Sequence, residues 1–251
     1  MLTKDKDSID IGIIGFGRFG QFLAGILKNS QQVRVYDKSD RTSEAANIRV
    51  DCVDLDVVCQ QNLLILAVPI SEIESVLEQI KTKGKKNIIV MDIGSVKEYP
   101  AELMLRILPK DIEIIAAHPM FGPDSAKNGL AGSQMVFWPL RIGEENFRSV
   151  KKIFENLDLK IIEATPEEHD RQTALSLCLV YFIGHGLEEM GIRPQEIATL
   201  NFGQLLKIRE TVANDSQQLF HDMQTHNRFA MPARKELLEA LRKIDETLKN
   251  A

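Results

Sequence analysis

A glycine-rich turn near the amino terminus constrains the fold of this chain more than any other feature. The segment Gly15-Phe16-Gly17-Arg18-Phe19-Gly20 follows an apolar run at Ile9–Ile14 and leads into helical apolar spacing over Arg18–Lys28. The first glycine allows a tight turn, the second lets a ligand approach the backbone, and the third allows helix and strand to pack closely. The segment therefore predicts a site for a dinucleotide pyrophosphate at the helix amino terminus.

Strands and helices alternate through the first part of the chain. Apolar runs predict strands at Ile9–Ile14, Val33–Tyr36, Leu63–Val68, Asn87–Met91, Glu113–Ala117, Met135–Trp138 and Lys160–Glu163. Helical spacing is found at Arg18–Lys28, from Ser71 to Ile80, at Lys97–Leu108 and at Glu144–Leu157. This alternation predicts an α/β fold with a doubly wound parallel sheet.

The pattern changes at Thr165-Pro166-Glu167-Glu168, which combines an N-cap, a first-turn proline and a capping-box glutamate. Only helices are expected beyond it, at Arg171–Met190, Pro194–Thr211, Ser216–Phe229 and Pro232–Leu248. We therefore expect an α/β domain over residues 1–164 and an all-helical domain over residues 165–251. The helix Arg171–Met190 is apolar nearly all round and needs burial on every side, which predicts a homodimer.

Bulk composition excludes several classes of protein. The formal charge of −5 argues against a broad nucleic-acid-binding surface. No apolar run approaches the roughly 20 residues that cross a membrane, and the amino terminus lacks a signal-peptide pattern. Three cysteines (Cys52, Cys59 and Cys178) have the spacing of neither a disulfide framework nor a zinc site. We expect a soluble cytoplasmic protein without a metal, a membrane partner or a nucleic-acid partner.

An acidic residue ends the second expected strand. Asp37 lies 17 residues beyond Gly20, where a carboxylate can accept hydrogen bonds from an adenosine ribose and repel a 2′-phosphate. The position favours NAD over NADP, although Lys38 and Arg41 lie close enough to offset part of the charge. The alternative role for Asp37 is a surface turn.

Ser95, Lys97 and His118 are candidates for chemistry. The first two lie in Asp92-Ile93-Gly94-Ser95-Val96-Lys97, which follows one expected strand, and His118 follows another. The carboxyl ends of parallel strands share one edge of a sheet, where ligands bind. A neutral imidazole there can act as a general base, and the rigid Pro-Met-Phe-Gly-Pro turn after it is expected to hold it. Ser95 is expected either to hydrogen-bond His118 or a substrate hydroxyl, or to serve only as an N-cap, while Lys97 could meet a carboxylate.

Together these residues resemble the prephenate/arogenate dehydrogenase family of tyrosine biosynthesis. The motifs that carry the likeness are Gly15–Gly20, Val68-Pro69-Ile70, Asp92–Lys97, His118–Pro123 with Asp124-Ser125, and Glu168-His169-Asp170. The resemblance implies a Rossmann domain that binds NAD, in part through Val68 and Pro69, followed by a helical dimerisation domain. It also implies oxidative decarboxylation, in which His118 accepts the proton of the ring hydroxyl, Ser95 orients His118 or that hydroxyl, and hydride passes to NAD⁺.

Two positions of the helical domain depart from the family pattern. Tyr181 stands where many relatives carry a second histidine. An arginine of the following helices is expected to bind the substrate carboxylate; Arg209 is the candidate, with Arg171 and Arg228 as alternatives. His169 matches the family's His-Asp pair, with either a structural or a functional role.

The choice of substrate depends on a loop after the histidine motif. Asn128 stands where the resemblance implies an acidic residue in arogenate-preferring relatives, which favours prephenate, and Asp124 is near enough to reverse this preference. We expect an NAD-dependent prephenate dehydrogenase that gives 4-hydroxyphenylpyruvate, with an arogenate dehydrogenase that gives tyrosine as the alternative. Two further alternatives are a related reductase of an imine or hydroxy acid and a nicotinamide-binding regulatory protein without turnover.

Overall fold

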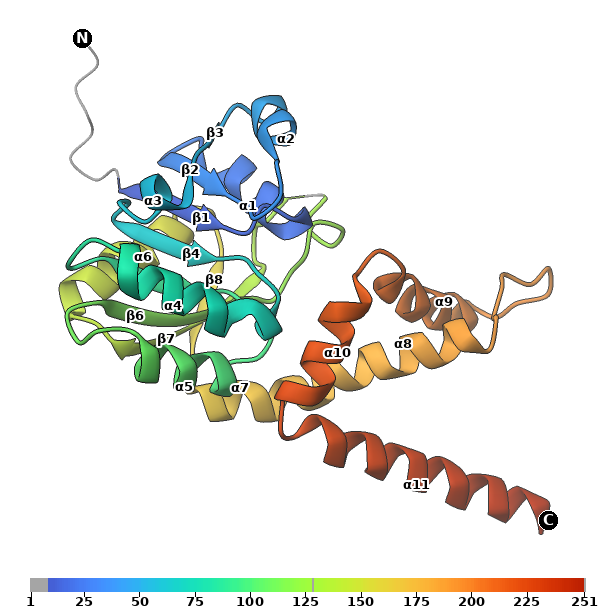
Figure 1. Cartoon of the computed structure of the whole chain (residues 1–251). Helices are drawn as coiled ribbons and strands as arrows, with labels where there is room; N and C mark the ends of the chain where they lie inside the picture. Colours follow the sequence, from blue (N-terminus) through green and yellow to red (C-terminus); the bar gives the residue numbers. More distant parts are fainter. Residues whose placement is uncertain (1–8, 128, 251) are drawn as a thin grey trace. The chain divides into compact units, whose positions relative to one another are not determined.

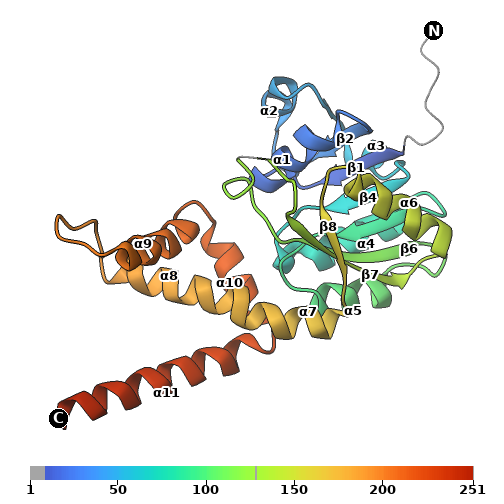
Figure 2. The same ribbon diagram turned by 180° about the vertical axis from the view of Figure 1, so that it is seen from behind.

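The computed structural model describes residues 9–127 and 129–250. The chain divides into two compact units, Met1–Pro166 and Glu167–Ala251. Figure 1 shows the first in blue to yellow and the second in orange to red, and Figure 2 shows both from behind. Each unit is described by itself.

One mixed sheet forms the centre of the first unit. Its described strands follow the order β3-β2-β1-β4-β5-β6-β7-β8. They are β1 (Asp10–Ile14), β2 (Gln32–Tyr36), β3 (Asp51–Cys52), β4 (Leu63–Leu66), β5 (Ile89–Asp92), β6 (Glu113–Pro119), β7 (Gln134–Arg141) and β8 (Lys160–Glu163). The helices are α1 (Arg18–Leu27), α2 (Thr42–Asn47), α3 (Leu55–Val58), α4 (Ile73–Lys83), α5 (Glu98–Ile107) and α6 (Glu144–Glu155).

Apolar side chains of the strands alternate between the two faces of the sheet. Ile11 and Ile13 belong to a core with residues of α1 and α6, whereas Leu64 and Leu66 belong to a core with residues of α3, α4 and α5. Because helices cover both faces, the strands are buried on both sides and read as continuous apolar runs. The expected Rossmann-type, doubly wound architecture is confirmed.

The direction of the last two strands differs from the all-parallel prediction. β7 pairs antiparallel with β6, so that His118 lies opposite Val136, and β8 runs parallel to β7. A parallel pair needs a crossover connection, usually a helix. None of the described residues between β6 and β7 is helical, so the chain returns directly and the strand direction reverses.

Short elements account for the other differences in this unit. α2, β3 and α3 are 6, 2 and 4 residues long, too short to show a periodicity in the sequence. The helix expected from Ser71 begins as a 3₁₀ turn, Ile70–Glu72, and becomes α-helical only at Ile73.

The second unit is built from helices. α7 (Pro166–Thr173) begins at the expected proline and continues into a π-helical segment (Ala174–Cys178) and α8 (Leu179–Glu189). α9 (Leu200–Ala213), α10 (Gln217–His226) and α11 (Ala230–Lys249) follow. α8 and α9 lie side by side, whereas the carboxyl-terminal end of α11 extends away from α8 (Figures 1 and 2).

Two helices of this unit differ from the prediction. The helix expected over Arg171–Met190 contains the π-helical segment, where Gln224 Nε2 donates to the carbonyl of Cys178 at 2.7 Å. This side-chain donor offsets a backbone bond that the wider turn gives up. The helix expected from Pro194 begins only at Leu200, because the Thr199 hydroxyl accepts a hydrogen bond from the backbone there and caps it.

Candidate cofactor and catalytic site

The glycine turn is closed on the side of β4 and open at its middle glycine. Gly15 has φ +98°, and a Cβ on it would lie 2.4 Å from the carbonyl oxygen of Ala67. A Cβ on Gly20 would lie 2.1 Å from the carbonyl oxygen of Gly15, whereas one on Gly17 would have no atom within 4 Å. These are the roles expected of the three glycines, and they leave room for a phosphate group beside Gly17.

The amino terminus of α1 lies directly after this turn. Gly17 is its N-cap, no side-chain hydrogen bond caps the helix, and no acidic residue lies in its first turn. The positive end of a helix dipole attracts an anion. The fit to a dinucleotide pyrophosphate is therefore good, and the Val68 side chain lies against the same turn, 2.9 Å from the Cβ position of Gly15.

Asp37 is tied to the glycine turn by its carboxylate. One oxygen accepts a hydrogen bond from the backbone N–H of Phe16 at 2.7 Å, and the other accepts one from the N–H of Ser39 at 2.9 Å. A carboxylate has about four acceptor positions, so two more hydrogen bonds from ribose hydroxyls can be made. Asp37 is thus joined to the glycine turn, the candidate cofactor site.

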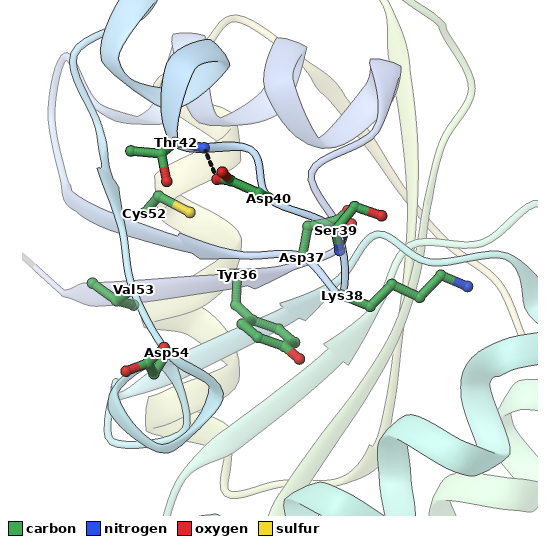
Figure 3. Close-up of a pocket in the computed structure, with 9 residues that line it drawn as sticks. All are labelled: Tyr36, Asp37, Lys38, Ser39, Asp40, Thr42, Cys52, Val53 and Asp54. Carbon is green, nitrogen blue, oxygen red and sulfur yellow. Dashed lines mark hydrogen bonds between the residues drawn. The ribbon is translucent and has the colours of Figure 1, made fainter.

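A cavity of about 360 Å³ lies beside Asp37 at the carboxyl ends of β2 and β3. It is lined by Tyr36, Asp37, Lys38, Ser39, Asp40, Thr42, Cys52, Val53 and Asp54, as Figure 3 shows. The basic side chains of this region already have acidic partners. Lys38 pairs with Glu72 at 2.6 Å and Arg41 with Glu44 at 2.8 Å, and these hydrogen bonds raise the pKa of both cations.

Ser95 and His118 lie at the carboxyl ends of the neighbouring strands β5 and β6. His118 is buried within β6, one residue before its end, rather than after it. The Ser95 hydroxyl is buried and has no hydrogen-bond partner among the described residues, so it does not bond to His118 here. The N-cap role for Ser95 is wrong, because α5 begins at Glu98 with Lys97 at the cap position and without a side-chain cap.

Lys97 faces the interior of the first unit. It is 1% exposed, and its Nζ donates to the carboxylate of Asp92 and, at 2.6 Å, to the carbonyl oxygen of Ala117. These bonds hold the ammonium inside the protein, away from the position expected for a group that meets a ligand carboxylate. A lysine and an aspartate next to a wholly apolar strand are the sequence signal for such a pair.

The segment after His118 is anchored to α1, which the sequence did not indicate. The rings of Phe121 and Phe22 meet edge to face with centroids 6.4 Å apart, and Asp124 forms an ion pair with Arg18 of the glycine turn. The charge of Asp124 is thus paired with a cation of the glycine turn. Asn128 lies outside the described residues.

The candidate substrate residues of the second unit have partners within that unit. Tyr181 donates its hydroxyl hydrogen to the carboxylate of Asp215. Arg209 pairs with Glu188, whose pKa this hydrogen bond lowers, and donates to the carbonyl of Ile192 at 3.1 Å.

The alternative arginines and His169 lie around α7. Arg171 and Arg228 both pair with Glu167, and Arg228 stacks 4.4 Å from the ring centre of Phe229. His169 is buried, and its Nδ1 lies 2.8 Å from a carboxylate oxygen of Asp170.

Two kinds of feature are absent from the part of the chain that the structure describes. It contains no group of three or more His, Cys, Asp or Glu side chains arranged to hold a metal ion. Among the same residues, no helix has the length and apolar character to span a membrane.

Comparison with known families gives a consistent result. The family model described as prephenate dehydrogenase, nucleotide-binding domain, matches residues 23–163. A second model, described as TYRAAT1-like, C-terminal domain, matches residues 186–251. The first match begins after the glycine turn, so the assignment of that turn rests on its geometry.

Individual relatives match along almost the whole chain. Arogenate dehydrogenase 1, chloroplastic, of Arabidopsis thaliana is 36% identical over 98% of this chain, and arogenate dehydrogenase 2 of the same plant is 31% identical over 98%. The chain spans 40% of the length of the first relative and 70% of the second. The crystal structure of a prephenate dehydrogenase from A. aeolicus with hydroxyphenyl propionate and NAD⁺ has a TM-score of 0.77 at 17% identity, covering 96% of this chain and 91% of that one.

Proposed function

Because this chain belongs to the prephenate dehydrogenase family, we propose that it converts arogenate to tyrosine and CO₂ with reduction of NAD⁺. The sequence motifs alone favour prephenate as the substrate. The two plant relatives that match 98% of the chain are named arogenate dehydrogenases, which favours arogenate. The second candidate substrate is prephenate, which the identity of Asn128 favours.

The observation that carries the proposed chemistry is the buried, unpartnered hydroxyl of Ser95 at the strand end beside that of His118. A buried polar group without a partner is rare and often marks a place that a ligand completes. In our proposal, the ring hydroxyl of the substrate hydrogen-bonds to Ser95 and to the imidazole of His118. NAD⁺, when bound, accepts the hydride that leaves the hydroxyl-bearing carbon.

His118 moves the proton in this proposal. Its neutral imidazole takes the hydroxyl proton as the hydride leaves. The bond between the ring and its carboxylate then breaks, and its electron pair makes the ring aromatic while CO₂ departs. The imidazolium returns the proton to the ring oxygen, so that no net proton is released.

The preference for NAD over NADP follows from charge. Asp37 places a carboxylate where the ribose would lie, and a 2′-phosphate would be repelled. Lys38 and Arg41 are already paired with Glu72 and Glu44, so neither cation is available without breaking an ion pair. The cofactor is tested by measuring the affinity for NAD⁺ and NADP⁺ separately.

The substrate is tested by following NADH formation with arogenate and prephenate in separate reactions. We expect a higher kcat/KM with arogenate. A higher value with prephenate would establish the second candidate. Tight binding of NAD⁺ without turnover of either compound would instead identify a regulatory protein.

Arg209 is our candidate for the substrate carboxylate, since it has a planar pair of donors suited to that group. For this role, Arg209 must break its ion pair with Glu188 and bind the substrate carboxylate instead. We expect Arg209→Met to raise KM at least about tenfold with a smaller change in kcat, as the loss of a charged hydrogen bond does. The matched variant Arg228→Met should leave KM unchanged, and the reverse pattern would move the role to Arg228.

A further inference from the structure

Asp92 and Lys97 form a buried ion pair next to the candidate catalytic edge. The side chains are 0% and 2% exposed, and Lys97 Nζ donates to the carboxylate of Asp92. Removal of two charges from water costs free energy that a buried pair often fails to regain, and apolar side chains of similar size are frequently as stabilising. Stability of the fold alone therefore does not account for this pair.

The carboxylate of Asp92 shapes the turn that presents Ser95. Its Oδ1 accepts a hydrogen bond from the backbone N–H of Gly94 at 2.8 Å, one residue before Ser95. The turn is tightly packed, since a Cβ on Gly94 would lie 3.1 Å from that same oxygen. A shift of Asp92 would thus move the backbone that carries the serine.

Near the end of β6, the ammonium of Lys97 donates a hydrogen bond to a carbonyl group that a neighbouring strand would otherwise bind. β5 ends at Asp92, opposite Ala116, so the carbonyl of Ala117 lies beyond the parallel ladder. A buried carbonyl needs a donor, and Lys97 Nζ supplies it at 2.6 Å. On the other edge of β6, β7 pairs with His118, so the strand end that carries the histidine is held from two sides.

We propose that Asp92 and Lys97 are positioning residues that set Ser95 and His118 at the spacing needed to share one substrate hydroxyl. The pair joins the two backbone segments that carry these side chains, and it is charged because a lysine long enough to reach Ala117 needs a counter-charge inside the protein. The inference rests on the proposed function for the role of Ser95 and His118. A displacement of about 1 Å between reacting groups can lower turnover about 100-fold.

The test is the double variant Asp92→Asn/Lys97→Met. It removes both charges, keeps side-chain volume nearly constant and retains an oxygen for the N–H of Gly94. The matched control is Asp56→Asn/Lys83→Met, which removes an exposed aspartate–lysine pair. We expect kcat of the test variant to fall about 10- to 100-fold, with KM and the affinity for NAD⁺ within about threefold of wild type. The control should match wild type in all three.

A second measurement needs no substrate. The NMR signal of the His118 imidazole in histidine-labelled protein is identified by its loss in His118→Asn. We expect this signal to shift in the test variant and not in the control. If the double variant does not fold, Lys97→Arg keeps the charge beside Asp92 but displaces the donor to Ala117, and the same two results are expected.

The outcomes separate the two proposals. A folded test variant with wild-type kcat and an unchanged His118 signal overturns the positioning role. Wild-type protein without turnover of arogenate or prephenate overturns the proposed function, and the His118 signal then decides the positioning role by itself.

Discussion

The proposed chemistry depends on the Ser95 hydroxyl, a buried polar group. It is buried, yet it makes no hydrogen bond with any described residue. An unsatisfied buried polar group costs about 1–3 kcal/mol. The folded protein tolerates this cost where a ligand later supplies the missing bond, as the ring hydroxyl does in our proposal.

Ser95→Ala is therefore expected to separate activity from stability. Removal of the hydroxyl should leave the free energy of unfolding unchanged or raise it by up to about 1 kcal/mol, while kcat falls about 10- to 100-fold. Denaturant unfolding and NADH formation measure the two effects, with Ser149→Ala on the exposed face of α6 as the control. Reduced stability with full activity would show that Ser95 has a structural role only.

His118→Asn should abolish turnover and keep the affinity for NAD⁺.

The three cysteines are expected to differ in reactivity. Burial raises the pKa of the Cys59 thiol to about 11 and that of Cys178 to about 12. Both are then protonated and unreactive near pH 8, since the thiolate is the nucleophile. Cys52 is half-buried and lines the cavity beside Asp37.

Thiol labelling of native protein should accordingly modify one cysteine, Cys52, and saturating NAD⁺ should slow that reaction. The other two thiols should react only after unfolding. Cys52→Ser is the control, because it should abolish the labelling of the native state. Labelling of Cys52 at the same rate with and without NAD⁺ would place the adenosine end of the cofactor elsewhere.

The strand–turn–helix unit at the start of the chain depends on two glycines for different reasons. A Cβ at Gly20 meets a carbonyl oxygen at 2.1 Å, whereas one at Gly17 meets nothing within 4 Å. The first contact lies within the folded chain, whereas the open side of Gly17 leaves room for the pyrophosphate in our proposal.

We expect Gly20→Ala to destabilise the protein by about 1–3 kcal/mol or more, because the turn must open. Gly17→Ala should change stability by less than about 0.5 kcal/mol and weaken NAD⁺ binding. Gly25→Ala, in the middle of α1 with open space around it, should stabilise by about 0.5–1 kcal/mol and leave binding unchanged. Unfolding curves and cofactor titrations measure these effects, and undiminished NAD⁺ affinity in Gly17→Ala would exclude the turn as the pyrophosphate site.

Elements whose own residues form an apolar pattern were predictable from the sequence. The shortest elements, and those shaped by distant side chains, were not. Strands such as Leu63–Leu66 are continuous apolar runs and helices such as α6 have an amphipathic period, and both patterns are set by neighbouring residues. The π-helical segment before α8 receives a side-chain hydrogen bond from a distant residue, since Gln224 donates to the carbonyl of Cys178. A local sequence pattern does not indicate a hydrogen-bond partner that lies far away in the sequence.

For the whole molecule, α11 carries the strongest indication of a partner. From Leu238 onward it exposes a stripe of apolar side chains, Leu238, Leu241, Ile244 and Leu248, which are 39–70% exposed. An amphipathic helix is stable when such a stripe is buried. We predict a homodimer in which a second copy of the chain covers this stripe.

Light scattering at micromolar concentration should give twice the mass of one chain. Leu241→Glu/Ile244→Lys should give a monomer, whereas Glu239→Lys, on the opposite side of the helix, should remain dimeric. A monomeric wild-type protein would contradict the prediction.

The cytoplasmic location stays a prediction, and a relative in Arabidopsis thaliana is named chloroplastic.

The glycine turn, the alternation of strands and helices, and the position of His118 near a strand end could be predicted from the amino-acid sequence. Each of these features depends on residues that are neighbours in the sequence, so a local pattern indicates it. Three features became apparent only in the folded chain: the reversal of β7, the burial of Lys97 against Asp92 and Ala117, and the hydrogen bond of Asp37 to Phe16. These depend on which distant segments meet, because a charged side chain takes the partner that the packed fold brings within hydrogen-bond distance.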